Sequence, residues 1–114
     1  MSYTVTDVPL KKLHWLFQGK QKCEHHKFSD GTEFMMYTIT KHKKETSFIF
    51  DPEDFDVVDG REWRSIKNGK VIYYFGNRAI KHLIGVFRDK HYPGQFISQK
   101  QIGLDYRKSN FVVG

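Results

Sequence analysis

Turn-forming pairs of residues divide this chain into short segments. Asn68-Gly69 is the strongest two-residue hairpin signal in the sequence, because both residues accept the positive φ angles of a type I′ turn. Asp-Gly pairs at 30–31 and 59–60 and the Gly-Asn pair at 76–77 mark further turns and breaks. The chain is therefore expected to form short strands and short helices.

Segments rich in aromatic and β-branched residues lie between these turns. Such segments favour strands, and two of them flank Asn68-Gly69 as the arms of a hairpin. Residues 20–27 are polar and irregular, and no regular element is expected there. The predicted strands are residues 33–39, 46–50, 63–66, 71–75, 95–98 and 111–113.

Three segments carry helix signals. The first covers residues 7–19, where Asp7 lies near the cap position and leucines recur at helical spacing. The second covers residues 51–58, where Asp51 can cap the first turn. The third covers residues 78–87, whose apolar residues again recur at helical spacing.

Length and composition indicate one domain. The chain has 114 residues, and its aromatic content of 16%, with ten Phe, is sufficient for a hydrophobic core. We expect a single α+β domain over residues 1–114, with antiparallel strands and two or three short helices. Residues 1–49 would form an N-terminal helix plus a hairpin.

The sequence carries no mark of a secreted or membrane protein. Cys23 is its single cysteine, which excludes an internal disulfide and fits a reducing compartment. No apolar run approaches the ~20 residues that span a bilayer. The N-terminus also lacks the pattern of a signal peptide. We expect a cytoplasmic protein without a membrane partner.

The chain is basic. Its formal net charge is +6, from 19 Lys and Arg against 13 Asp and Glu, and the basic residues are spread from Lys11 to Lys108. Basic charge with many aromatic residues suits DNA or RNA, but it also suits an acidic protein partner. The expected oligomeric state is a monomer or a weak homodimer.

From Phe50 onward, the order of motifs resembles the HNH homing-endonuclease family of phages and mobile elements. The corresponding pieces are "FDPEDFDVV" at 50–58, Trp63, "VIYY" at 71–74, "IKHLI" at 80–84 and "LDYRKSNFVV" at 104–113. The resemblance covers a little over half of the chain, and residues 1–49 match only loosely. It implies that residues 50–114 are an HNH-like part with an eroded ββα-metal fold.

The residues that carry catalysis in that family are missing. Its Asp-His pair, which supplies a metal ligand and a general base, falls on Ile97 and Ser98. The family histidine in the "IKHLI" segment falls on Lys81, with His82 one position further on. The family's ligand-bearing helix would follow Gly114, so we expect it to be missing as well. The resemblance therefore implies no catalytic residue, no metal and no cofactor.

Basic residues gather around the predicted 63–75 hairpin and the helix after it. In the family this half of the domain faces DNA, so the resemblance implies contacts with phosphates, although a solvated basic face explains the residues equally well. The candidate contacts to nucleic acid or a partner are Arg61, Arg64, Lys67, Lys70, Arg78, Lys81, His82, Lys90, Arg107 and Lys108.

Several other residues have structural interpretations. Asp105 and Asn110 match positions that brace a loop in the family, and their short polar side chains can bond to the local backbone. Trp63 is expected in the core. Of Tyr73 and Tyr74, one should face inward and the other outward. Cys-Glu-His-His at 23–26 lacks the second ligand pair of a zinc site, so no metal is expected there.

Three functions remain open from sequence. The first is an inactive HNH-like protein that binds nucleic acid or a nucleic-acid-bound host nuclease, as an anti-CRISPR-like inhibitor of host defence. The second is an active endonuclease with a rearranged site that uses His82 or His91. The third is a protein-binding module without a role on nucleic acid.

Overall fold

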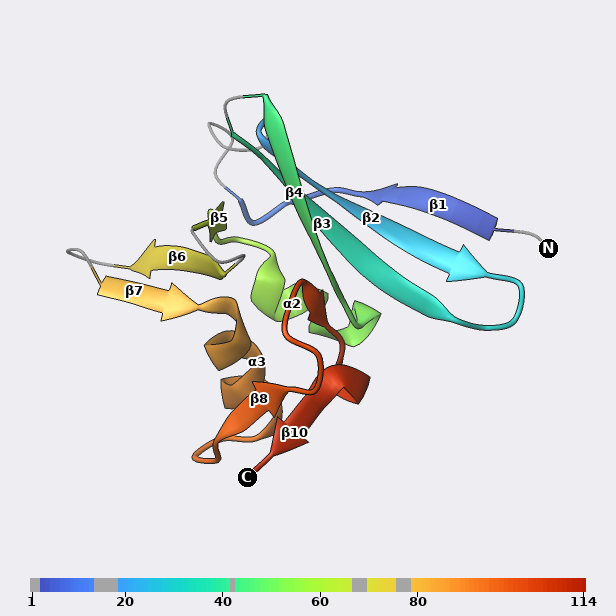
Figure 1. Ribbon diagram of the computed structural model, residues 1–114. Helices are drawn as coiled ribbons and strands as arrows, with labels where there is room; N and C mark the ends of the chain where they lie inside the picture. The colour runs from blue at the N-terminus through green and yellow to red at the C-terminus, as the bar shows by residue number, and fades with distance from the viewer. Residues whose placement is uncertain (1–2, 14–18, 42, 67–69, 76–78) are drawn as a thin grey trace.

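A five-stranded sheet combines four strands of the N-terminal half of the chain with a short strand from near the C-terminus (Figure 1). The computed structural model describes residues 3–13, 19–41, 43–66, 70–75 and 79–114. Within them, neighbouring strands of this sheet pair antiparallel, except that β4 and β9 are parallel. The strands, in spatial order, are β1 (Tyr3–Val8), β2 (Gln21–Phe28), β3 (Glu33–Lys41), β4 (Lys44–Phe50) and β9 (Asp105–Tyr106).

The remaining elements gather on one side of this sheet (Figure 1). A three-stranded antiparallel sheet contains β5 (Arg64–Ser65), β6 (Val71–Phe75) and β7 (Ala79–His82). A two-stranded sheet pairs β8 (Ile97–Gln99) with β10 (Phe111–Val113). The helical elements are η1 (Pro52–Asp54), α2 (Phe55–Val58), α3 (Leu83–His91) and η3 (Lys108–Asn110). The predicted α+β class with mostly antiparallel strands is confirmed.

Aromatic side chains from distant segments form the core. Alternation along the strands turns Tyr37 and Phe48 to the covered face of the large sheet, and both are 0% exposed. Trp63 packs edge-on against Phe48 and is also 0% exposed, as predicted. Phe87 of α3 contacts the same core. Truncation of a buried aromatic of this size costs about 3–5 kcal/mol, so these rings contribute much of the stability.

The predicted helix at 7–19 is wrong over the residues that the structure describes. Asp7 and Val8 end β1, where Val8 pairs with Cys23 of β2. Leu10 and Leu13 are buried from a turn instead of a helix. The pairing of β1 with β2 outweighs the weak helical spacing of the leucines. Leu10 and Leu13 can be buried from a turn as well as from a helix, so their spacing does not require a helix. Residues 14–18 lie outside the described part of the chain.

Residues 20–27 were predicted to be irregular, yet Gln21–Phe28 form an eight-residue strand. Polar residues occupy two buried positions of this strand and form hydrogen bonds to residues distant in sequence. Gln21 bonds to Trp63 and Tyr37, and His26 bonds to the hydroxyl of Tyr3. A pattern of hydrophobic residues cannot reveal a strand that is buried through polar side chains.

The predicted helix at 78–87 begins too early. Ala79–His82 form strand β7, which pairs with β6, and α3 begins only at Leu83. His82 is therefore exposed on a strand and is not part of a helix face. The predicted strands are all confirmed, with shifts at their ends. They are the segments at 33–39, 46–50, 63–66, 71–75, 95–98 and 111–113.

The segment after β4 is helical, as predicted, but its cap differs. Asp51 makes no side-chain cap bond to the helix. Its carboxylate Oδ2 accepts a hydrogen bond from the backbone N–H of Lys108, at 2.8 Å. This bond ties the C-terminal segment to the start of η1. Among the described residues, no helix combines the length and the apolar character needed to cross a membrane.

Candidate nucleic-acid interface

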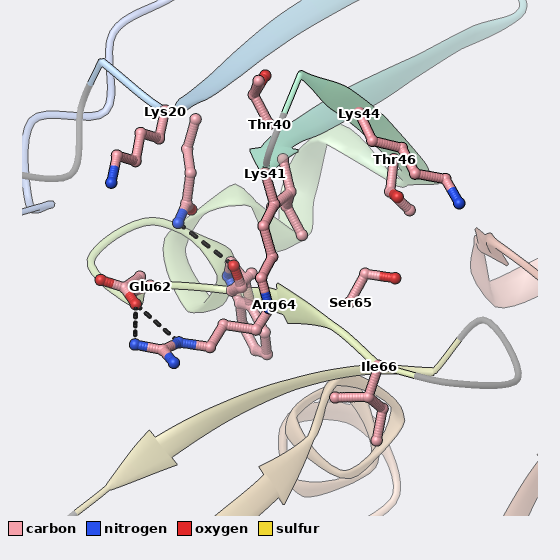
Figure 2. Close-up of a pocket in the computed structure, with 12 residues that line it drawn as sticks. Lys20, Thr40, Lys41, Lys44, Thr46, Glu62, Arg64, Ser65 and Ile66 are labelled. Atoms are coloured by element: carbon pink, nitrogen blue, oxygen red, sulfur yellow. Dashed lines mark hydrogen bonds and ion pairs between the residues drawn. The ribbon is translucent and has the colours of Figure 1, made fainter.

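A pocket of about 600 Å³ lies between β5 and the adjoining ends of β2, β3 and β4 (Figure 2). This volume is in the range of small-molecule sites. We call it the lysine pocket. It is lined by Lys20, Gln21, Ile39, Thr40, Lys41, Lys44, Thr46, Glu62, Trp63, Arg64, Ser65 and Ile66.

Buried residues hold one wall of the pocket in place. The side-chain amide of Gln21 donates a hydrogen bond to the carbonyl oxygen of Trp63, at 3.3 Å. The amide oxygen of Gln21 accepts a hydrogen bond from the hydroxyl of Tyr37. The indole N–H of Trp63 donates to the carbonyl oxygen of Val58, at 2.8 Å. Because each polar group has a partner, this wall is rigid.

Strand register brings three lysines to the rim of the lysine pocket. Lys41 pairs directly with Lys44 at the end of the β3–β4 hairpin, and the N–H of Thr40 donates to the carbonyl oxygen of Lys20. All three lysine side chains are exposed, and no ion pair joins them to a described carboxylate. In Figure 2, Lys20 and Lys41 lie around the opening with Arg64, while Lys44 points away from it.

Arg64 connects the lysine pocket to a second surface. Its guanidinium group forms hydrogen bonds to Glu62, with Nη2 and Nε at 2.6 and 2.8 Å from Oε1. The guanidinium carbon also lies over the ring of Tyr74, 5.1 Å from the ring centroid. The Arg64 side chain nevertheless remains 51% exposed. The guanidinium group is thus held by contacts with Glu62 and Tyr74, and it remains accessible to a ligand.

The second surface is the outer face of the β5–β6–β7 sheet. Arg64 and His82 both pair with Ile72, and Tyr74 pairs with Ile80, so these side chains share one face. Tyr74 and Ile80 are each 49% exposed. We define this outer face by Arg64, Ile66, Lys70, Tyr74, Ile80 and His82. It combines cations with apolar and aromatic groups.

The structure places only part of the predicted contact set on this surface. Arg64, Lys70 and His82 lie together on the outer face. Lys67 and Arg78 lie outside the described residues. Arg61 instead donates a hydrogen bond to the carbonyl oxygen of Val57 and lies over the ring of Tyr73.

Four other members of the predicted set are held by carboxylates. In each pair, the hydrogen bond from the basic side chain lowers the pKa of the carboxyl group. A phosphate would have to compete with these carboxylates. The pairs are Lys81–Asp89, Lys90–Asp56 (2.7 Å), Arg107–Asp105 (2.7 Å) and Lys108–Glu53.

Glu53, Asp54 and His91 form a cluster with the spacing of a metal site. Asp54 is 0% exposed, and its Oδ1 lies 2.6 Å from Nε2 of His91 and 3.2 Å from Nζ of Lys90. Lys90 and Lys108 already supply positive charge to these carboxylates, so a metal cation would have to displace ammonium groups. We name the set of Glu53, Asp54, Asp56, Lys90, His91 and Lys108 the acidic clamp.

The Cys-Glu-His-His segment at 23–26 does not converge on a metal. It lies in β2, where successive side chains alternate between the two faces of the sheet. Cys23 is buried in the core, and burial raises the pKa of its thiol to about 12. A thiolate ligand is therefore disfavoured there.

The C-terminal loop is held by Asn110. Its amide nitrogen donates to the carbonyl oxygens of Gln101 and Asp105, at 3.0 and 2.9 Å, and its amide oxygen accepts from the N–H of Gln101. Ile97 is buried and Ser98 is exposed on the adjacent β8 strand. Neither residue carries a carboxylate or an imidazole that could serve as a metal ligand.

Sequence reasoning missed the three lysines of the rim. Lys20 lies more than twenty positions before Lys41 in the chain, and only the register of β2 with β3 joins them. In the sequence, the run of basic residues Lys-His-Lys-Lys at 41–44 is the signal that could have indicated Lys41 and Lys44.

No protein-family model matches the chain, and the comparisons with curated proteins and with solved structures find no match either.

Proposed function

We propose that this protein binds nucleic acid through the lysine pocket and the adjoining outer face, without cleaving it. The observation that carries the proposal is the rim of Lys20, Lys41 and Lys44, which no described carboxylate neutralises. Ammonium groups without a carboxylate partner attract phosphates, and their binding releases the counterions that surround the nucleic acid. Aromatic and apolar groups beside them are the usual companions of such cations in nucleic-acid sites.

The absence of catalysis is part of the proposal. The HNH resemblance places its Asp-His pair on Ile97 and Ser98, and neither residue can activate water or hold a metal. The segments that resemble the family would then hold the fold together, and the lysine pocket would serve binding. Occupying a guide or a target strand in this way would obstruct a defence nuclease, as expected of an anti-CRISPR-like inhibitor.

A charge-matched pair of variants tests the binding site. The test variant replaces Lys20, Lys41 and Lys44 with Gln. The control replaces three exposed lysines that do not line the pocket, Lys22, Lys27 and Lys100, so both proteins have a net charge of +3. Affinity for a labelled oligonucleotide is measured by fluorescence anisotropy between about 50 and 400 mM salt.

The test variant should lose about 0.7 of salt slope per lysine, or about 2 in total, which corresponds to about 100-fold weaker binding at 0.1 M salt. The control should keep most of its affinity. An equal loss in both variants would mean that net charge, and not this pocket, governs binding. Binding that does not weaken as salt rises would contradict phosphate contacts altogether.

A magnesium-dependent nicking assay tests the absence of cleavage. Supercoiled plasmid should stay intact at a protein excess. Cleavage that disappears in His82→Ala or His91→Ala would establish a rearranged nuclease site instead.

A further inference from the structure

We propose that the preferred ligand is a single strand, and that one unpaired base enters the lysine pocket and stacks on the guanidinium plane of Arg64. This inference rests on the proposed function and names its substrate class. DNA and RNA strands share the required chemistry, namely a planar base with phosphates on both sides.

The Tyr74–Arg64 pair provides the stacking surface. Glu62 holds the guanidinium group through two hydrogen bonds to one carboxylate oxygen, and the guanidinium carbon lies over the ring of Tyr74, 5.1 Å from its centroid. Half of the Arg64 side chain stays exposed. Unpaired bases stack on such guanidinium planes as they do on aromatic rings. A base on Arg64 would therefore add a planar contact next to the existing Arg64–Tyr74 contact.

The shape and lining of the pocket favour a base over a duplex surface. Ile39 and Ile66 contribute apolar groups to a concave space of about 600 Å³, and Lys20 and Lys41 lie at its rim. The bases of a duplex are stacked on one another, so their faces are unavailable unless a base is flipped at a cost in free energy. A single strand offers its bases without this cost.

The charges match the same arrangement. Lys20 and Lys41 can hold the phosphates on either side of the inserted base, while the carboxylate of Glu62 stays bonded to Arg64. A nucleotide thus meets cations where it is charged and apolar or planar groups where it is not.

Arg64→Lys is the decisive variant, because it keeps the positive charge and removes the plane. Four labelled ligands of about 12 nucleotides are compared by anisotropy at one salt concentration: a DNA strand, an RNA strand of the same sequence, the DNA duplex and an abasic DNA strand. Tyr74→Ala removes the support of the stack. Tyr3→Ala is its matched control, because Tyr3 is also 49% exposed but lies on β1. Urea unfolding verifies that each variant is folded.

The wild-type protein should bind the better of the two single strands at least about tenfold more tightly than the duplex or the abasic strand. Arg64→Lys and Tyr74→Ala should each reduce this preference about tenfold while binding of the duplex and abasic strand stays unchanged. Tyr3→Ala should change nothing.

Equal affinity for all four ligands, with no effect of Arg64→Lys, would overturn the single-strand inference and leave the proposed function standing. A failure to bind any of the four ligands would overturn both. The ratio between the RNA and DNA strands identifies which of them the pocket prefers.

Discussion

The lysine pocket and the acidic clamp are both rich in cations, yet they differ in what faces those cations. At the pocket, Lys20 and Lys41 have no ion pair with a described carboxylate. At the clamp, Lys90 and Lys108 each form ion pairs with carboxylates of the 53–56 segment. Positive charge in a sequence therefore does not identify a binding surface, because a paired cation is already neutralised.

The acidic clamp joins elements that are distant in the sequence. Its carboxylates lie on η1 and α2, His91 and Lys90 lie on α3, and Lys108 lies on η3. Ion pairs across these elements tie the C-terminal segment and α3 to the end of β4. The "FDPEDFDVV" motif, which carries much of the HNH resemblance, is thus engaged in holding the fold together.

The largest effect that would separate the two regions is expected at Asp54. Asp54→Asn removes the charge from a side chain that is 0% exposed and leaves Lys90 and His91 without their buried partner. The free energy of unfolding should fall by about 3 kcal/mol, measured by urea denaturation. Nucleic-acid affinity of the folded protein should be unchanged.

Asp89→Asn is the control for this prediction. It also breaks an ion pair of a predicted contact residue, Lys81, but Asp89 is exposed. It should cost less than about 1 kcal/mol. If Asp54→Asn costs no more than Asp89→Asn, the clamp does not stabilise the fold.

A smaller effect of opposite sign is expected at Glu62. Glu62→Gln removes the one carboxylate that lines the pocket but keeps an acceptor for Arg64. Removing a like charge about 6 Å from a phosphate is worth about 0.7 kcal/mol in water. Affinity for a single strand should therefore rise about threefold. Glu33→Gln, at the opposite end of β3, has the same change in charge and should have no effect. Equal gains in both would assign the effect to net charge.

The smallest effect concerns stability in acid. The pKa of Asp56, Asp89 and Asp105 is lowered in the folded protein by hydrogen bonds from basic side chains. The unfolded chain therefore takes up protons first, near the ordinary aspartate pKa of 3.8. The stability that these pairs contribute is fully present above that value and is lost as pH falls through the lowered folded values.

Asp105→Asn should flatten this acid dependence, with a change below about 1 kcal/mol in urea denaturation series from pH 6 downward. Glu45→Gln serves as the control, since Glu45 is exposed and has no ion pair with a described residue. If the acid profile of Asp105→Asn superimposes on that of the wild type, the Arg107–Asp105 pair does not contribute to the acid dependence of stability.

Sequence patterns predicted the strands that are rich in aromatic and β-branched residues and whose ends carry turn signals. Residues 46–50 and 71–75 are of this kind, and Trp63 was assigned to the core. Strand β2 escaped prediction because the hydrogen-bond partners of Gln21 and His26 are distant in sequence. Strand β7 escaped prediction because its residues continue the helical spacing of the following segment, although β7 pairs with the nearby strand β6. In the candidate site, Arg64 and His82 could be named from sequence, whereas Lys20 could not.

The amino-acid sequence by itself determined the α+β class, the aromatic core and the excess of positive charge, because these follow from composition and local spacing. Tertiary structure alone decided which cations face a carboxylate and which face solvent. The reason is physical: ion pairing depends on separations of a few ångströms, and in pairs such as Lys90–Asp56 and Lys108–Glu53 the docking of helices sets those separations between residues tens of positions apart.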